Sequence, residues 1–399
     1  MQDSGPLKGV KVLELGSLIA GPFAGRLFGD FGAEVIKVEP PKIGDPLRKW
    51  RLLKDGTSLW WYVQSRNKKC ITLDLKSKEG EEIIKKLAKE VDIIIENFKP
   101  GTLEKWNIGY EDLKKINPKI IMVRISGYGQ YGPYSSKPGF GSIGEALGGI
   151  RYLSGYPDLP PVRTGISIGD SIAAIYAVMS AVMAIYNRDI NGGEGQYIDV
   201  ALYEAIFSLM ESLVPEYDQF KFIRERSGNT LPGIAPSNIY LCKDGKYVAI
   251  GANGDSIFQR LTKAMQRDDL AENEAFKSND GRAQNMQYID EQITKWTMTK
   301  NIDEALAILD EHQIPSGAIY NVEDMFQDAH FKARDMIKSV NIEGVGDLKV
   351  PGIIPKFSQT PGSIKWSGRK LGENNHEIYH DLLGMSDKKL KDLEERGII

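Results

Sequence analysis

The sequence predicts an α/β protein with a doubly wound parallel sheet, followed by a smaller α+β region. Strand-like and helix-like segments alternate over roughly the first 200 residues, which is typical of parallel strands joined by crossover helices. Short apolar runs such as residues 92–96 are typical of strands that are covered on both faces. The composition shifts around residues 216–226, and after the loop at residues 228–236 Lys243-Asp-Gly-Lys246 lies between two strand-like segments and predicts an antiparallel hairpin.

The N-terminal segment predicts the first βαβ unit. Residues 10–15 read as a strand, residues 21–31 as a helix with Pro22 in its first turn, and residues 33–38 as a second strand. The glycines of this segment, at positions 16, 21, 25 and 29, do not form the GxGxxG pattern and therefore disfavour a nicotinamide cofactor. A turn that leads into a helix N-terminus nevertheless suits a phosphate group.

The alternation continues to about residue 213. We predict further strands at residues 70–75, 92–96, 119–125 and 196–201, and helices starting at Ser77 and spanning residues 111–117, 170–186 and 203–213. A glycine- and tyrosine-rich loop at residues 126–149 is too long for a simple connection, which favours a functional role.

The length of 399 residues is sufficient for two domains. We expect the first domain to span residues 1–224. Residues 225–330 then form a smaller α+β domain that is inserted into the first or follows it. The tail, residues 331–399, contains a hairpin signal near residues 340–350 and two helical segments after Gly372.

Composition excludes several classes of protein. The 51 basic and 54 acidic residues give a net charge of −3, so no basic field attracts nucleic acid or anionic lipid. The N-terminus lacks a signal-peptide pattern, and the longest apolar run, residues 172–186, is too short to span a bilayer. Cys70 and Cys242 are far apart in the chain, which disfavours a disulfide framework or a thiolate metal site. We therefore expect a cytoplasmic protein.

The four histidines all lie in the last quarter of the chain, at positions 312, 330, 376 and 380. This excludes an HExxH zinc site, and the base of any Ser-His-Asp triad would have to come from far downstream. His376 and His380 have a helical spacing that could bind a metal ion. Their polar surroundings favour exposed side chains without one, so we predict no metal site.

Asp170 stands between Gly169 and a helix that is apolar on nearly all sides. Such a helix must be covered all round, which places Asp170 at the mouth of a packed core. One interpretation is that Asp170 only caps the helix. The other is that Gly165 and Gly169 let a ligand approach a carboxylate that performs chemistry. The segment by itself leaves both open.

Taken together, eight segments in order resemble the class III CoA-transferases, the family of formyl-CoA and carnitine CoA-transferases with 2-methylacyl-CoA racemase as a relative. The segments are LGSLIAGP at 15–22, VIKVE at 35–39, NKK at 67–69 with LDL at 73–75, ENFKPG at 96–101, SGYG at 126–129, KPGFG at 137–141, GISIGD at 165–170 and LLGM at 382–385. The resemblance covers nearly the whole chain.

The resemblance implies a large Rossmann-like domain built from both ends of the chain, so that residues 331–399 return to it, and a homodimer whose subunits interlock. It also implies that coenzyme A is a co-substrate and that no metal or redox cofactor is needed. By position, residues that line the CoA site correspond to Ala20, Leu73, Asn97, Phe98, Lys105 and Lys137. The catalytic aspartate corresponds to Asp170.

The implied chemistry suits an aspartate, which is ionised at pH 7 without an activating histidine. The carboxylate attacks an acyl-CoA thioester and gives an aspartyl anhydride, which CoA converts to an aspartyl-CoA thioester before a carboxylic acid acceptor reverses the sequence. Ile19 stands where formyl-CoA transferases have glutamine, which argues against formate or oxalate as substrate. Phe140 stands where the racemase has its histidine base.

Three other functions remain as alternatives. The first is an acyl-CoA racemase or epimerase, which the missing histidine at Phe140 makes the weaker interpretation. The second is a non-catalytic acyl-CoA binding protein. The third is a nicotinamide-dependent dehydrogenase, which the glycine spacing disfavours. The sequence does not identify the acyl donor or the acceptor acid.

Overall fold

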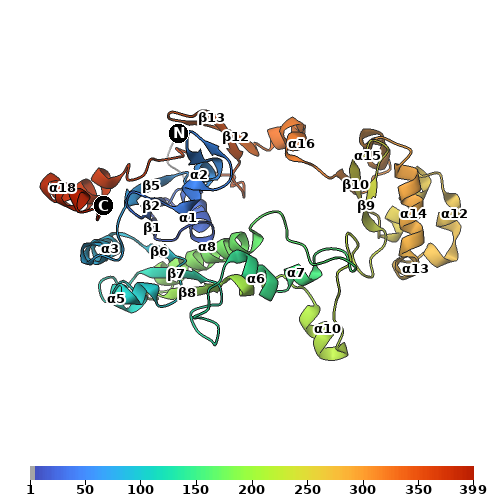
Figure 1. Cartoon of the computed structure of the whole chain (residues 1–399). Coiled ribbons are helices and arrows are strands. Elements are labelled where there is room, and N and C mark those ends of the chain that lie inside the picture. Colours follow the sequence, from blue (N-terminus) through green and yellow to red (C-terminus); the bar gives the residue numbers. More distant parts are fainter. Residues whose placement is uncertain (1–4) are drawn as a thin grey trace. The chain divides into compact units, whose positions relative to one another are not determined.

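A computed structural model describes residues 5–399 (Figure 1). The chain divides into two compact units. The first consists of the chain up to Arg151 with Thr164–Lys221 and Lys332–Ile399, and the second of Tyr152–Arg163 and Phe222–Phe331. The predicted limits at residues 224 and 330 are close to these, whereas residues 152–163 group with the second unit instead of the first. The assignment of CoA binding to the first unit stays a prediction.

A six-stranded parallel sheet forms the centre of the first unit and confirms the predicted α/β class (Figure 1). The strands are β1 (Lys11–Glu14), β2 (Glu34–Glu39), β5 (Lys68–Thr72), β6 (Ile93–Glu96), β7 (Ile121–Ser126) and β8 (Tyr197–Ala201). Their order is β5-β2-β1-β6-β7-β8, and all neighbours are parallel. The chain moves outward from β1 in one direction and from β6 in the other, so the strand order reverses between β1 and β6.

Different helices cover the two faces of this sheet. Successive strand residues point to opposite faces, and Val12 and Leu13 of β1 accordingly belong to separate hydrophobic clusters. On the Val12 face lie α1 (Ala20–Asp30) and α8 (Ile168–Asp189). On the Leu13 face lie α3 (Lys78–Glu90), α5 (Tyr110–Lys114) and α18 (Asp387–Glu395). Ser77 caps α3 as predicted, because its hydroxyl accepts the N–H of Gly80 at 2.9 Å.

Within the described chain, α8 is covered on one face only, so the expectation that it is covered on every side is wrong for the chain by itself. Its alanines, among them Ala173, Ala177 and Ala181, are buried and let the helix approach the sheet and α1 closely. Its large apolar side chains point away: Ile175 is 54% exposed and Met183 is 59% exposed.

The length of α8 also differs from the expected one. The helix has 22 residues and, within residues 5–399, is the one helix long and apolar enough to cross a membrane by length and composition alone. The apolar run at residues 172–186, which was expected to be too short to span a bilayer, is only the central part of this helix. The alanine face of α8 packs in a buried cluster with β7, β8 and α1, as expected for a core helix of a globular unit.

Short elements complete the first unit. They are η1 (Pro46–Lys49), β3 (Leu53–Lys54), β4 (Thr57–Ser58), α2 (Leu59–Gln64), α4 (Thr102–Lys105), α6 (Gly141–Leu147), α7 (Ile150–Leu153, which crosses into the second unit), α9 (Leu202–Phe207) and α10 (Leu213–Phe220). The predicted helix at 203–213 therefore ends early, and a second one follows it. β12 (Ile337–Ile342) and β13 (Gly346–Pro351) form the predicted hairpin.

The C-terminal segment runs along the edge strand β5. The side chain of Asn374 accepts the N–H of Cys70 at 2.9 Å, and that of Asn375 accepts the N–H of Thr72 at 2.9 Å. These side chains satisfy backbone donors of a sheet edge that is otherwise open to pairing. The π-helix η3 (Glu377–Leu382) follows and leads to α18.

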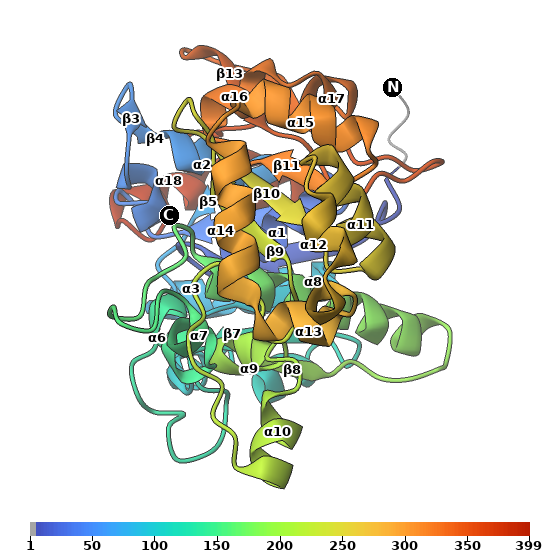
Figure 2. The ribbon, with the colours of Figure 1, turned by 90° about the vertical axis from the view of Figure 1, so that its right-hand side faces the viewer.

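The second unit is built on a three-stranded antiparallel sheet of order β11-β10-β9. β9 (Ser237–Leu241) and β10 (Tyr247–Gly251) form the predicted hairpin, and β11 (Ser316–Ala318) pairs with β10. Its helices are α11 (Asp255–Ala264), α12 (Asp268–Glu272), η2 (Glu274–Phe276), α13 (Asn279–Gln284), α14 (Met286–Thr297), α15 (Ile302–Glu311), α16 (Val322–Gln327) and α17 (Ala329–Ala333, which crosses into the first unit). Figure 2 shows α11, α14 and α15 grouped around this sheet, with which they share one hydrophobic core.

Candidate active site

The reversal of strand order between β1 and β6 marks the expected position for a ligand. In open α/β sheets, ligands bind outside the carboxyl ends of the strands at such a switch point. Two elements of the first unit meet there. The turn at residues 15–19 follows β1 and leads into α1, and Asn97 follows β6.

Asn97 holds this turn. Its Oδ1 accepts the N–H of Ser17 at 2.8 Å, and its Nδ2 donates to the carbonyl of Ser17 at 2.9 Å. Gly16 is packed so closely that a Cβ there would lie 2.7 Å from Oδ1 of Asn97. The side-chain amide therefore joins the ends of β1 and β6.

Buried charged side chains also hold the turn at residues 15–19. Nζ of Lys37 lies 3.1 Å from the carboxylate of Glu14 and 2.9 Å from that of Asp45, and it donates to the carbonyl of Gly16. Asp45 also accepts the N–H of Leu18 at 3.1 Å, and Leu18 has a φ of 66°, which is rare for a residue with a side chain. Burial lowers the pKa of Lys37, but the carboxylates of Asp45 and Glu14 outweigh burial, so the pKa lies above its usual range. A charged network thus stabilises a strained turn.

The glycines of α1 have a packing role that their spacing did not reveal. A Cβ at Gly25 would collide with the carboxylate of Glu14, at 2.9 Å from its Cδ. That carboxylate also binds Lys68, whose Nζ lies 2.7 Å away. A Cβ at Gly29 would lie 3.0 Å from the Cβ of Asn67. The glycines at positions 25 and 29 therefore let α1 pack directly against the buried polar side chains of Glu14 and Asn67.

Asp170 lies in the first turn of α8, where the helix dipole favours a negative charge. The other end of α8 is tied to the amino edge of the sheet, because Arg188 pairs with Asp92 at 3.0 Å, so the first turn points toward the carboxyl edge. The partly buried carboxylate of Asp170 rests against Gly141. A Cβ at position 141 would lie 2.7 Å from Cγ of Asp170 and 3.2 Å from its Oδ1. Only glycine leaves room for this carboxylate.

Glu145 supports the turn that carries Asp170. It is 1% exposed; its Oε1 accepts the N–H of Gly169 at 3.4 Å, and its Oε2 lies 3.4 Å from the guanidinium of Arg151. A Cβ at Gly169 would lie 3.3 Å from Cγ of Glu145. A buried carboxylate therefore contacts the residue that precedes Asp170, and a cation pairs with that carboxylate. Sequence reasoning missed both residues, because neither lies in a recognisable spacing and the contact spans 24 residues.

A second ionic network holds the segment that follows β6. Nε of Arg124 lies 2.8 Å from Glu96, and its NH1 group lies 2.7 Å from Glu104. Burial raises the pKa of Glu96 to about 7, although Arg124 opposes the shift. Glu96 also accepts the N–H of Phe98 at 2.8 Å. The network therefore orders residues 96–105, which carry three of the predicted CoA-lining side chains.

The long loop between β7 and α6 is closed at its base. Gly127 and Gly139 lie so close that a Cβ on either would stand 2.8 Å from the Cα of the other. The N–H of Gln130 is held by Asp199 of β8 at 2.8 Å. Nζ of Lys137 lies 3.7 Å from the ring centre of Tyr134, and both side chains are exposed.

The predicted CoA-lining residues fall into three groups. Ala20 and Leu73 are buried, Asn97 and Phe98 are partly buried, and Lys105 and Lys137 are exposed. The structure brings Ala20 and Asn97 to the switch point. The side chain of Leu73 belongs to the core on the Leu13 face, where Phe98 also packs. Their contacts with CoA, like the catalytic role of Asp170, stay predictions.

Comparison with known proteins identifies the family of this chain. The family model described as "CoA-transferase family III" matches residues 7–375. The chain belongs to this family. As a family III CoA-transferase it is 48% identical over 395 residues to succinyl-CoA–D-citramalate CoA-transferase of Chloroflexus aurantiacus, covering 99% of this chain and 98% of that protein. It is 31% identical over 400 residues to human succinyl-CoA:glutarate CoA-transferase, covering 100% of this chain and 91% of the human protein.

Solved structures give the same result. A CaiB/BaiF family protein from Brucella suis superposes with a TM-score of 0.84 at 34% identity, covering 95% of this chain and all of the other. Rv3272 from Mycobacterium tuberculosis superposes with a TM-score of 0.82 at 25% identity, covering 93% and 98%. The predicted family and the predicted enzyme class are therefore confirmed. The family III CoA-transferase uses a CoA thioester as co-substrate.

Proposed function

We propose that this enzyme transfers CoA from succinyl-CoA to a second small dicarboxylic acid, and that Asp170 carries the acyl group and then CoA. The strongest support is the position of Asp170, whose carboxylate lies in the first turn of α8 and contacts Gly141. Relatives of the chain are named for succinyl-CoA with citramalate, malate or glutarate, all of which are dicarboxylic acids.

The exchange needs four displacements at acyl carbons. An Asp170 oxygen attacks the donor thioester, the carbon–sulfur bond breaks, and CoA leaves as thiolate, giving an anhydride. The thiolate then attacks the Asp170 carbonyl, and the donor acid leaves with the bridging oxygen, giving an aspartyl-CoA thioester. The acceptor carboxylate displaces CoA from Asp170, and CoA finally attacks the acceptor carbonyl and frees the aspartate. Each step makes and breaks one acyl bond, so atoms and electrons balance without another reactant.

Arg151 is the cation that we assign to the second carboxylate of the substrate. Its guanidinium contacts Glu145, which in turn contacts the N–H of Gly169 beside Asp170. Its side chain remains 30% exposed, and an arginine fork matches a carboxylate in geometry. A substrate joined to Asp170 through one carboxyl group would then direct the other toward Arg151. Lys137, which the resemblance assigns to the CoA site, is exposed on the loop beside Tyr134.

Two variants test these roles. Asp170→Asn keeps the size of the side chain and removes its nucleophilicity, so we expect turnover with succinyl-CoA to be lost while CoA binding persists. Undiminished exchange by Asp170→Asn would refute the mechanism. Arg151→Met is expected to raise KM for dicarboxylic acceptors by about tenfold or more, which corresponds to ~1.4 kcal/mol, and to leave a monocarboxylic acceptor unaffected. An equal change in KM for both acceptors would refute the assignment of Arg151 and leave the role of Asp170 untouched.

We further propose that the enzyme is an interlocked homodimer. Its first unit exposes a set of large apolar side chains along α8 and α10: Ile175, Met179, Val182, Met183, Tyr186, Val214, Tyr217 and Phe220. Exposed apolar surface of this extent is typical of an interface. Light scattering is expected to give the mass of two chains. Mixed populations with different tags should not exchange subunits until they are unfolded, and rapid exchange would contradict interlocking.

We also propose a cytoplasmic location. Both cysteines, Cys70 and Cys242, are free and buried, which suits a reducing compartment. Fractionation of cells that express the untagged protein tests the location, and recovery outside the cytoplasmic fraction would contradict it.

A further inference from the structure

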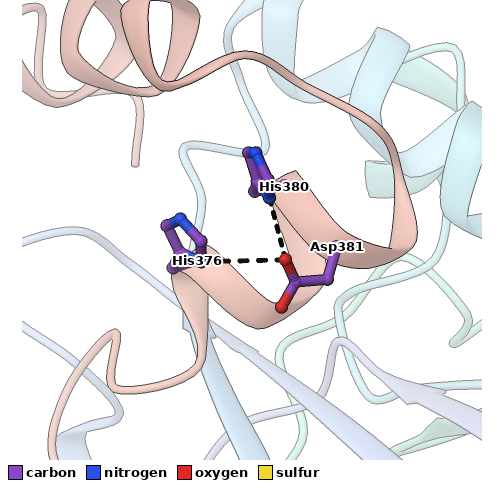
Figure 3. A group of neighbouring side chains, drawn as sticks. All are labelled: His376, His380 and Asp381. Carbon is purple, nitrogen blue, oxygen red and sulfur yellow. Dashed lines mark hydrogen bonds and ion pairs between the residues drawn. The ribbon is translucent and has the colours of Figure 1, made fainter.

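Two histidines and an aspartate gather on the C-terminal segment, in a part of the molecule that the proposed transfer reaction does not use. Figure 3 shows His376, His380 and Asp381 with their polar atoms turned toward one another. Their ligand atoms all lie within 4.8 Å of one another. Nδ1 of His380 lies 2.8 Å from Asp381, and Nδ1 of His376 lies 3.9 Å from the same oxygen.

The backbone that carries these side chains is firmly anchored. Ile378 and Tyr379, which lie between His376 and His380 in the sequence, are 1% and 0% exposed and pack in the core on the Leu13 face. The hydroxyl of Tyr379 also donates to the carbonyl of Thr72 on β5 at 2.6 Å. The π-helical turn therefore fixes which side chains point outward, and single π-turns occur frequently at functional sites.

The two imidazole rings are arranged in parallel. Their centres lie 4.6 Å apart with an interplanar angle of 21°. The other ring nitrogen of His376 faces a second carboxylate, because Nε2 of His376 lies 3.3 Å from Asp387 in the first turn of α18. All four side chains are between 41% and 80% exposed, so an ion from solution reaches them without any opening of the fold.

We propose, in place of the sequence-based prediction of no metal site, that His376, His380 and Asp381 bind a divalent transition-metal ion of the Zn²⁺ class. Neutral imidazole nitrogen and carboxylate oxygen are the donors that such ions prefer, and three of them leave the fourth position of a tetrahedral shell to water. The ligand atoms, which all lie within 4.8 Å of one another, close around the ion by side-chain rotation. Asp387 faces the other ring nitrogen of His376 and orients that ring.

The proposal is tested on the full-length, untagged protein after treatment with a chelator. Co²⁺ is titrated as a spectroscopic probe, and Zn²⁺ is titrated against a chromogenic chelator. We expect one equivalent to bind, with visible Co²⁺ bands of a nitrogen- and oxygen-ligated tetrahedral ion. His380→Ala should weaken Zn²⁺ binding at least tenfold, and the double variant His376→Ala with His380→Ala should abolish it.

The matched control is His330→Ala, which removes an exposed histidine at a site away from the cluster in the sequence. Its binding should equal that of the native chain. Added Zn²⁺ should also raise the thermal midpoint of the native chain and of His330→Ala but not that of the double variant. Native binding no tighter than that of the double variant, or equal losses in His330→Ala, would overturn the proposal. These readouts do not depend on CoA transfer, so the proposed function can fail while the metal site stands.

Discussion

Gly141→Ala places one carbon atom against the proposed nucleophile and leaves its chemistry intact. The added Cβ would lie 2.7 Å from Cγ of Asp170 and 3.2 Å from its Oδ1. Oδ2 of Asp170 lies closer still, so relief to an ordinary contact of about 3.5–4.0 Å requires the carboxylate to move by at least about 1 Å. A displacement of that size at a reacting group costs on the order of 10²-fold in rate, or ~2.7 kcal/mol in the activation barrier.

The fold should tolerate the change. Position 141 begins α6, and alanine is a better helix former than glycine by about 0.5–1 kcal/mol, so the thermal midpoint should stay the same or rise. The assay is kcat for CoA transfer from succinyl-CoA to a series of dicarboxylates, together with the thermal midpoint.

Gly317→Ala is the matched control, because a Cβ at Gly317 meets no atom within 4 Å. It should keep both kcat and stability. A Gly141→Ala enzyme that folds normally and turns over at the native rate would show that the position of Asp170 against Gly141 is not the reactive one.

Three further predictions concern the residues that hold the site. Asn97→Ala removes both hydrogen bonds to Ser17, so we expect the free energy of unfolding to fall by about 1–3 kcal/mol and the KM for acyl-CoA to rise. Denaturant unfolding and initial rates measure the two effects. An unchanged KM would contradict a role of Asn97 in ordering the turn. Glu145→Ala leaves Arg151 without this carboxylate and should lower kcat more than it raises the KM for CoA; a change in thermal midpoint alone would reduce Glu145 to a packing role. Burial raises the pKa of Glu96 to about 7, so the folded state binds a proton more tightly than the unfolded state does. The stability from this group is therefore present below about pH 4.5 and declines as pH rises to about 7, by up to ~3 kcal/mol. Glu96→Gln should flatten the thermal midpoint between pH 5 and pH 7.5 relative to the native chain, and parallel profiles would contradict the assignment.

The sheet could be predicted from the sequence because its evidence is local. Apolar runs such as residues 92–96, and caps such as Ser77, are determined by neighbouring residues, and the structure places β6 and α3 there. Element ends were less predictable: the strand expected at residues 70–75 lies at Lys68–Thr72. The N–H of Leu73 still bonds to the carbonyl of Glu39 on β2, but that of Asp74 bonds to Ile398, which is far away in the sequence.

The supports of the site could not be predicted in this way. Asn97 and Ser17 are 80 residues apart, and Glu145 and Gly169 are 24 apart, so no window of sequence contains both partners. The exposed face of α8 was missed for a related reason. Its composition shows that the helix is apolar, but not that alanines such as Ala177 face the sheet while Met183 faces away.

The most direct measurement of the central claim follows oxygen atoms. In the proposed series of displacements, the acceptor carboxylate displaces CoA from Asp170. When the new acyl-CoA forms, one oxygen of the acceptor stays on the Asp170 side chain. Turnover with an acceptor labelled with heavy oxygen, followed by proteolysis and mass spectrometry, should therefore find the label in the peptide that contains Asp170 and in no other acidic residue. An unlabelled Asp170 after many turnovers, with label only in the released acids and thioesters, would contradict the account.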